Sequence, residues 1–356
     1  MKKKTVLVLG GAGYIGSHTC VELINAGYYV IIVDNISNSD ISAIKCVETI
    51  TDKRIPYYII DCCDKEALRE VFVENTFDSV IHFAAYKAVG ESVDNPLKYY
   101  QNNLTSFMNV VELMLEYDCH NIVFSSSATV YGEADILPVT EKTPCKPATS
   151  PYGETKQMCE NMLENIAKAY PSINAIALRY FNPIGAHPSA LIGELPKGVP
   201  NNLVPFITQT AAGIRECLSV FGGDYPTPDG TCLRDYIDVV DLAKAHVVSI
   251  KRLISGKNKS KYEVFNIGTG KPVSVLELIK VFEEVNNLKL NYKITDRRPG
   301  DITAIWADTT LANTELGWKA ERSLEETLKS AWEWEKNIKD RLKITNEIWQ
   351  KFYKIK

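Results

Sequence analysis

TVLVLGGAGYIGSH, residues 5–18, is a short apolar strand followed at once by a glycine-rich turn and the start of a helix. In a dinucleotide-binding turn of this kind Gly10 permits the tight bend, Gly13 lets the backbone approach a pyrophosphate, and Gly16 lets the helix pack on the sheet. Amides at the start of the helix attract the phosphates. The glycine spacing differs from G-x-G-x-x-G, so taken alone the stretch also fits an ordinary strand-to-helix turn.

The sequence around this turn alternates short apolar runs with segments long enough for a crossover helix. That alternation predicts a parallel sheet, and the near-continuous apolarity of the runs predicts helices on both of its faces. We therefore predict an α/β fold with a Rossmann-type, doubly wound parallel sheet. The predicted strands are 5–9, 29–33, 57–60, 79–83, 121–125 and 175–178.

After about residue 180 the chain changes to long polar connections such as NPIGAHP, with short strands and helices in mixed order. Two late helices are marked by capping boxes, Ser274 with Glu277 and Ser323 with Glu326. We predict a smaller mixed α/β C-terminal domain that binds the substrate. The expected limits are 1–180 for a cofactor domain that receives later strand and helix segments, 181–337 for mainly the substrate domain, and 338–356 for a lysine-rich tail.

Composition favours small-molecule partners. The chain is 45% hydrophobic and 24% charged with a net charge of −4, which gives no electrostatic support for binding nucleic acid or a membrane surface. The apolar run 6–9 is too short for a signal peptide, and no run reaches the roughly 18 residues of a membrane span. Nine cysteines without a CxxC pair indicate reduced thiols, so a cytoplasmic protein is expected. Histidine and cysteine spacings predict no metal site.

Acidic and apolar residues at the strand ends extend the cofactor prediction. Asp34 ends the second run, where a carboxylate accepts hydrogen bonds from an adenosine ribose and repels a 2′-phosphate, so NAD is predicted rather than NADP. Asp61 closes the third run and either holds the adenine edge or serves the loop as a cap. The residues after the fourth run lie at the carboxyl edge, where ligands bind in such sheets; they are Phe83, Ala84, Ala85 and Lys87.

A catalytic group is predicted from Ser127, Tyr152 and Lys156. Tyr152 and Lys156 are four residues apart on a predicted helix, so the ammonium should lie beside the phenol and favour a phenolate, although tyrosine ordinarily titrates near ~10. The serine run 125–127 alone fits a polar turn, and the Tyr–Lys pair alone fits a surface contact. Together with the glycine turn they predict dehydrogenase chemistry, with Ser127 bonded to the phenol or to a substrate oxygen.

Several motifs together resemble the UDP-glucose 4-epimerase family of the extended short-chain dehydrogenase/reductase superfamily, from about residue 5 to about residue 335. They are GGAGYIGSHT, HFAAYKAVGES, SSSATVYG, SPYGETK, RYFNPIGAHPS, PNNL, YPTPDGTCLRDY and WAD. The resemblance implies an NAD-dependent isomerase that interconverts UDP-glucose and UDP-galactose through a transient 4-keto sugar. Tyr152 would take the 4-hydroxyl proton, Ser127 would support that transfer, and Lys156 would also bind the nicotinamide ribose.

The resemblance also implies binding residues. For the cofactor they are Gly10, Gly13, Tyr14, Ile15, Gly16, Asp34, Asn35, Asn38, Ser39, Asp61, Cys62, Phe83, Ala84, Ala85, Lys87, Asn102, Tyr152, Lys156 and Tyr180. For the UDP-hexose they are Lys87, Ser127, Phe181, Asn182, Asn201, Asn202, Leu203, Phe221, Arg234, Arg298, Asp301 and Ile305. The two arginines suit a diphosphate and Phe221 suits the face of uracil.

Three alternatives follow from particular residues. Ile305 stands where some bacterial relatives have a tyrosine and others a small residue that admits N-acetylated hexoses, so weaker turnover of UDP-N-acetylglucosamine and UDP-N-acetylgalactosamine is expected. A nucleotide-sugar 4,6-dehydratase would need an acidic pair where this chain has Ala128 and Thr129. A non-catalytic NAD-binding sensor would not need the intact Tyr152 and Lys156.

A homodimer is expected because relatives pair through two helices that match 96–117 and 152–169. The apolar stripe of the first helix consists of Leu104, Phe107, Val111 and Leu115, and it fits either a partner or the sheet of its own subunit.

Overall fold

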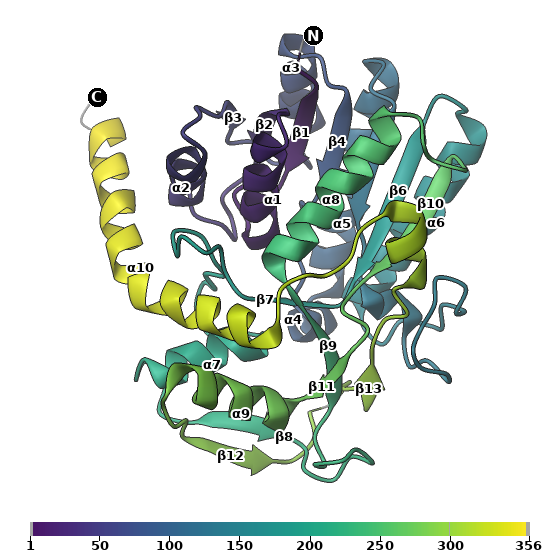
Figure 1. The fold of residues 1–356 in the computed structure, drawn as a ribbon. Coiled ribbons are helices and arrows are strands. Elements are labelled where there is room, and N and C mark those ends of the chain that lie inside the picture. Colours follow the sequence, from purple (N-terminus) through teal and green to yellow (C-terminus); the bar gives the residue numbers. More distant parts are fainter. Residues whose placement is uncertain (1–2, 299, 354–356) are drawn as a thin grey trace.

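A computed structural model describes residues 3–298 and 300–353, the side chains of 339–353 excepted. Its larger lobe is built on a seven-stranded, wholly parallel sheet, seen at the top of Figure 1. Strand order is β10-β6-β5-β4-β1-β2-β3, which reverses direction between β1 and β4. The strands are β1 (Thr5–Leu9), β2 (Tyr29–Val33), β3 (Tyr57–Tyr58), β4 (Ser79–His82), β5 (Asn121–Ser125), β6 (Asn174–Tyr180) and β10 (Tyr262–Ile267).

Helices cover both faces of this sheet, as the doubly wound prediction requires. In β1, Val6 and Val8 enter the hydrophobic core on one face, while Leu7 and Leu9 enter the core on the other. One face is covered by α1 (Tyr14–Asn25), α2 (Ser42–Thr51) and α8 (Val239–Ile254). The other is covered by α3 (Lys65–Glu74), α5 (Pro96–Glu116) and α6 (Pro151–Ala169).

A smaller lobe contains the short strands of the second half (Figure 1). Strand β9 pairs with β7 and β13 in parallel and with β11 in antiparallel orientation, and β8 pairs with β12. Its own core includes Ile207, Val220 and Phe282. The strands are β7 (Asn182–Ile184), β8 (Leu218–Phe221), β9 (Leu233–Asp238), β11 (Pro272–Ser274), β12 (Tyr292–Thr295) and β13 (Ala304–Ile305), and the helices are α7 (Leu203–Ala211) and α9 (Val275–Asn286).

Three shorter elements complete the described fold. Helix α4 (Val89–Asp94) precedes α5, the 3-10 turn η1 (Ala128–Tyr131) follows β5, and the π-helical turn η2 (Ala312–Leu316) precedes the last helix. None of the helices in the described part of the chain combines the length and the apolar character that a membrane span needs.

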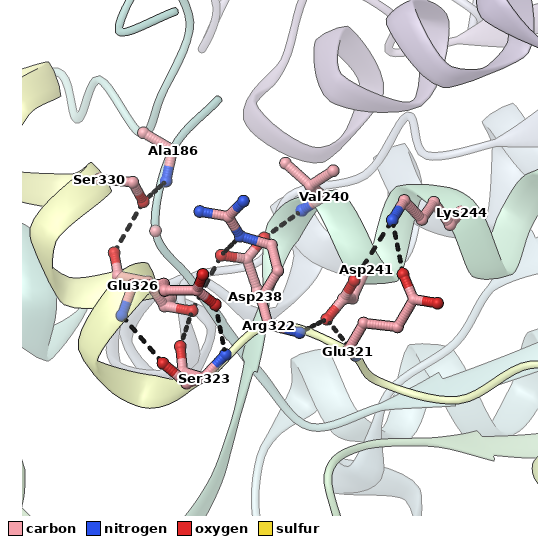
Figure 2. A network of polar contacts seen from close by, with 12 residues as sticks. Ala186, Asp238, Val240, Asp241, Lys244, Glu321, Arg322, Ser323, Glu326 and Ser330 are labelled. Carbon is pink, nitrogen blue, oxygen red and sulfur yellow. Dashed lines mark hydrogen bonds and ion pairs between the residues drawn. The ribbon is translucent and has the colours of Figure 1, made fainter. Parts of the chain in front are cut away.

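The last helix, α10 (Leu324–Tyr353), is tied to both lobes at its start. Asp238 is the last residue of β9 and directly precedes α8. Figure 2 shows its carboxylate accepting a hydrogen bond from the Arg322 guanidinium, at 2.8 Å. On α10 the Ser330 hydroxyl accepts from the amide of Ala186, beyond β7. The phenol of Tyr14 donates to the neighbouring Gly185 carbonyl at 2.7 Å, so this network reaches the glycine-rich turn.

Most predicted elements match the structure, and the differences are at their ends. Strand β3 covers only residues 57–58 of the predicted 57–60, while β6 extends the predicted 175–178 in both directions to Asn174–Tyr180. Both capping boxes are present, with each serine and glutamate satisfying the other's backbone amide. Helix α10 continues without a break past residue 338, where the tail is predicted to begin. From residue 339 onward the side chains of this tail lie outside the part of the chain that the structure describes.

Candidate active site

A cavity of about 590 Å³ opens at the carboxyl ends of the central strands. It is bounded by the glycine-rich turn after β1, the loops after β2, β3 and β4, and residues of α5 and α6. Because β1 and β4 are neighbours whose crossovers run to opposite sides, this is the crevice in which open α/β sheets bind ligands. Every residue predicted to bind the cofactor lies in its wall.

The glycine-rich turn is shaped for a close approach of the backbone to a ligand. Gly10 has a φ of +79°, and a methyl group on it would lie 3.0 Å from the Ala84 amide nitrogen. A methyl group on Gly16 would lie 2.2 Å from the Gly10 carbonyl oxygen, so this helix residue must be glycine. Helix α1 begins at Tyr14, and its N-cap residue Gly13 has no side chain to cap it, which leaves the first amides of the helix available for phosphate oxygens. The turn therefore fits a dinucleotide pyrophosphate.

Asp34 joins this turn to the loop after β2. Its carboxylate accepts hydrogen bonds from the amides of Ala12 at 3.0 Å and Ile36 at 2.9 Å, and from the Ser39 hydroxyl at 2.7 Å. Asp61 is more exposed, and it accepts from Asn35 and from the Cys63 amide. Both carboxylates thus brace the walls at the end of the cavity where an adenosine is predicted.

The three predicted catalytic residues come together, and two of them, Tyr152 and Lys156, line the cavity. Lys156 donates from Nζ to the Ser125 carbonyl at 2.7 Å and lies 5.9 Å from the centroid of the Tyr152 ring. Both side chains are buried on α6. Ser127, at the end of the serine run, acts on the Tyr152 phenol as a hydrogen-bonding neighbour. Tyr180 is adjacent, with its hydroxyl 2.6 Å from that of Ser125.

The surroundings of Tyr152 oppose the phenolate that the sequence favours. Burial raises the pKa of Tyr152 well above its ordinary value, the nearby Tyr180 raises it further, and the hydrogen bond from Ser127 offsets only part of this rise. Burial also lowers the pKa of Lys156 to about 8, so the ammonium persists at neutral pH. Burial therefore opposes ionisation of the phenol, and the Lys156 ammonium is directed at the Ser125 carbonyl.

The predicted substrate residues are divided among several places. Lys87, Asn201 and Asn202 line the cavity. Phe181 and Ile305 pack with Ala128 in a small buried cluster beside η1. Ser127 lies beside Tyr152 at the end of β5, and the remaining residues lie in the smaller lobe or at its border.

Four of these residues form an exposed-to-half-buried cluster on the smaller lobe. Asp301 accepts from the Arg298 Nη2 at 2.7 Å and lies 3.8 Å from the Arg234 Nη2. The Arg298 guanidinium is 5.7 Å from the centroid of Phe221, whose ring is 42% exposed. Ile305 is the direct strand partner of Arg234, which connects this cluster to the buried one. Asn182 lies on β7 and Leu203 starts α7, so neither is in the cavity wall.

Glu194 and Lys197 are cavity residues that the sequence did not single out. One carboxylate oxygen of Glu194 accepts from Lys87 Nζ at 3.1 Å and from the Asn202 amide at 2.6 Å. Lys197 donates to the carbonyls of Ile36 and Ser37. Isolated charges in a polar loop carry no pattern, so no sequence signal distinguished them. No group of three metal-ligating side chains is found among the described residues.

Comparisons with known proteins match this geometry. The family model described as GDP-mannose 4,6 dehydratase matches residues 7–331. A UDP-glucose 4-epimerase of Bacillus subtilis is 52% identical over 93% of this chain and 96% of its own.

Two solved structures have the same fold. The UDP-glucose 4-epimerase of Bifidobacterium longum, in complex with NAD+ and UDP, is 48% identical with a TM-score of 0.90, and the match covers 94% of this chain and 98% of that one. The enzyme from Stenotrophomonas maltophila, with bound NAD and formylated UDP-arabinopyranose, is 44% identical with a TM-score of 0.91, covering 95% and 99%.

Proposed function

Because the chain belongs to the UDP-glucose 4-epimerase family, we infer that it is an NAD-dependent isomerase that interconverts UDP-glucose and UDP-galactose through a transient 4-keto sugar. One observation carries this inference: the glycine-rich turn and the Tyr152–Lys156 pair line a single cavity. When bound, NAD supplies the acceptor for the C4 hydride and returns that hydride to the other face of the sugar.

We propose the following roles for the chain's own residues. Tyr152 takes the 4-hydroxyl proton as a phenolate and returns it as the phenol, and Ser127 shares that proton's hydrogen bond. Lys156 holds the ribose of the nicotinamide and keeps a positive charge beside the phenol. Lys87 and Asn202, already joined through Glu194, would hold phosphate oxygens between the two ligands.

The cluster on the smaller lobe is proposed to hold the UDP part of the substrate. Arg298 and Arg234 bring two guanidinium groups to Asp301, and the exposed Phe221 ring offers a face for uracil. Epimerisation requires a firm grip on the diphosphate and a looser grip on the hexose, which must present both faces. The predicted cofactor residues all lie within 1–180, and most of the predicted substrate residues lie within 181–337. This distribution supports the proposed domain limits.

The name of the matching family model raises dehydration as a rival. Ala128 and Thr129 begin η1, and neither side chain is a general acid or base at neutral pH. The epimerase relatives therefore agree better with this site.

Incubation of the purified protein with UDP-galactose, without added cofactor, is expected to yield UDP-glucose. NAD carried through purification would accept and return the same hydride, so no net oxidation is expected. Separation of the nucleotide sugars by ion-exchange chromatography measures the product. A released 4-keto-6-deoxy sugar, or no conversion even with added NAD, would contradict the proposed function.

Ile305 is proposed to limit the size of the sugar. It is 6% exposed and packs against Ala128 and Phe181, close to the serine run. We expect a lower kcat/KM for UDP-N-acetylglucosamine than for UDP-glucose, and a larger relative kcat/KM for the acetylated sugar in Ile305→Ala. Ile302→Ala, in the same cluster, is the control and should leave the ratio unchanged. Equal kcat/KM values for both sugars in the wild type would refute this role.

A homodimer through α5 and α6 is also proposed. The two helices pack together, yet Leu97, Met108 and Met158 remain 71%, 44% and 38% exposed. The predicted stripe is not this surface, because Phe107 and Val111 are buried in the core of their own subunit. Sedimentation velocity is expected to show a dimer that Met108→Glu weakens; a wild-type monomer at micromolar concentration would exclude it.

We further propose that the enzyme acts in galactose metabolism in the cytoplasm. All nine cysteines are free thiols, as expected in a reducing compartment.

A further inference from the structure

Three consecutive serines, residues 125–127 at the end of β5, are each held by a different residue of α6. The three α6 residues are spaced by four positions, so they share one face of the helix. The pairs are the Ser125 carbonyl with Lys156 Nζ at 2.7 Å, the Ser126 hydroxyl with the Glu160 carboxylate, and the Ser127 hydroxyl with the Tyr152 phenol. Glu160 thus continues the line of the two catalytic residues.

Arg179, on β6, connects Glu160 to the other side of Ser127. Its guanidinium donates to both oxygens of Glu160, from Nε at 3.0 Å and from Nη2 at 2.6 Å. From Nη1 it donates to the Tyr131 hydroxyl at 3.1 Å, and it lies 4.9 Å from the centroid of that ring. Ser126 and Tyr131, which flank Ser127, are therefore anchored to one ion pair.

This ion pair is buried, with side-chain exposures of 6% for Glu160 and 8% for Arg179. Burying two charges has a desolvation cost that often cancels their attraction, so a buried pair is weak evidence for a contribution to stability. The carboxylate is nevertheless fully used, since Ser126, Arg179 and the Tyr262 hydroxyl all donate to it. A satisfied buried network rigidifies what it binds. Here that is the segment carrying Ser127.

We propose that the Glu160–Arg179 pair, acting through Ser126 and Tyr131, clamps residues 126–131 and sets the position of the Ser127 hydroxyl against the Tyr152 phenol. Glu160, Arg179 and Ser126 are then positioning residues for the proton transfer. This inference rests on the proposed function, in which Tyr152 is the base.

Ser126→Ala is the sharpest test because it removes one anchor and keeps the ion pair. We expect kcat to fall roughly tenfold to hundredfold, as for other small displacements of reacting groups, with KM for UDP-galactose unchanged. The acid limb of the kcat–pH profile should move to higher pH, because Ser127 is the neighbour that lowers the pKa of Tyr152. The other groups facing this phenol are Lys156, Tyr180 and Tyr99, and the variant leaves them in place. Ser126→Thr, which keeps the hydroxyl, should restore both quantities.

Arg252 and Glu263 provide a matched control for Glu160→Gln. They form a second bidentate ion pair, 2.7 and 2.8 Å long and 9% exposed at each side chain, between α8 and β10. Glu160→Gln and Glu263→Gln should lower Tm alike, while only Glu160→Gln lowers kcat and moves the acid limb. The same kcat and pH profile in both variants would overturn the proposal.

A readout without turnover separates this inference from the proposed function. In a crystal structure of Ser126→Ala, we expect the Ser127 hydroxyl to move away from Tyr152 while Glu160 and Arg179 stay paired. An unmoved Ser127 refutes the clamp, whether or not the wild-type protein epimerises UDP-galactose. A wild type that is inactive on this sugar refutes only the proposed function.

Discussion

Replacing Tyr152 by phenylalanine is expected to lower kcat for UDP-galactose by about a thousandfold, within the range that general acid–base groups contribute. The Tyr152 ring is 7% exposed and packs in the cavity wall. Phenylalanine keeps this ring and lacks only the hydroxyl, so the fold and the binding of NAD should be unchanged. The structure makes this loss large because Ser127 has no ionisable side chain to substitute for the phenol. Measurements are kcat by product analysis, and NAD content by absorbance after denaturation.

Tyr58→Phe is the control for losing a tyrosine hydroxyl. Its phenol bonds to Glu74 at 2.8 Å and to Asn75 at 3.0 Å at the outer edge of the sheet, and the variant should keep wild-type kcat. If Tyr152→Phe retains a tenth or more of the wild-type kcat, Tyr152 is not the base.

Gly16→Ala is expected to weaken the binding of NAD strongly. The added methyl group would lie 2.2 Å from the Gly10 carbonyl oxygen and 2.8 Å from the Gly11 Cα, and both neighbours are backbone. The turn must open to relieve this overlap, which removes the cradle for the pyrophosphate and strains the packing of α1. We expect the Kd for NAD to rise by at least about a hundredfold, or ~2.7 kcal/mol, together with a lower Tm.

Gly90→Ala is the matched control. Gly90 lies in α4 near the same cavity, and an added methyl group there meets no atom within 4 Å. Because alanine favours helix more than glycine does, this variant should bind NAD normally and be slightly more stable. Calorimetric titration with NAD and thermal melting measure both variants. Wild-type affinity in Gly16→Ala would mean that the turn does not hold the cofactor.

Much of the fold could be predicted because its signals are local. Strands β1, β2 and β5 have the predicted limits, since continuous apolar runs flanked by turns specify buried parallel strands. The ends of β3 and β6 could not be predicted, because a strand extends as far as its neighbour offers backbone groups. Strand β10 adds to β6 at the sheet edge, and no periodicity within 262–267 identifies that partner.

The candidate site divides in the same way. Every predicted cofactor residue lies in one cavity wall, and most of them follow the carboxyl ends of neighbouring strands, where open parallel sheets bind ligands. Glu160 and Arg179 were missed, although Glu160 lies four residues beyond Lys156 on the same helix face. From the sequence alone, a carboxylate at position 160 is expected to face solvent. Its burial and its partner Arg179 become evident only when β6 lies beside α6.

By itself, the sequence determined the parallel α/β architecture, the glycine turn and the spacing of Tyr152 and Lys156, because strand alternation and helix periodicity act over a few neighbouring residues. Only the tertiary structure decided the burial of Tyr152, the sharing of Glu194 by Lys87 and Asn202, and the contact of Glu160 with Arg179. Burial and pairing depend on segments far apart in the chain, and desolvation acts only once those segments have closed around a charge.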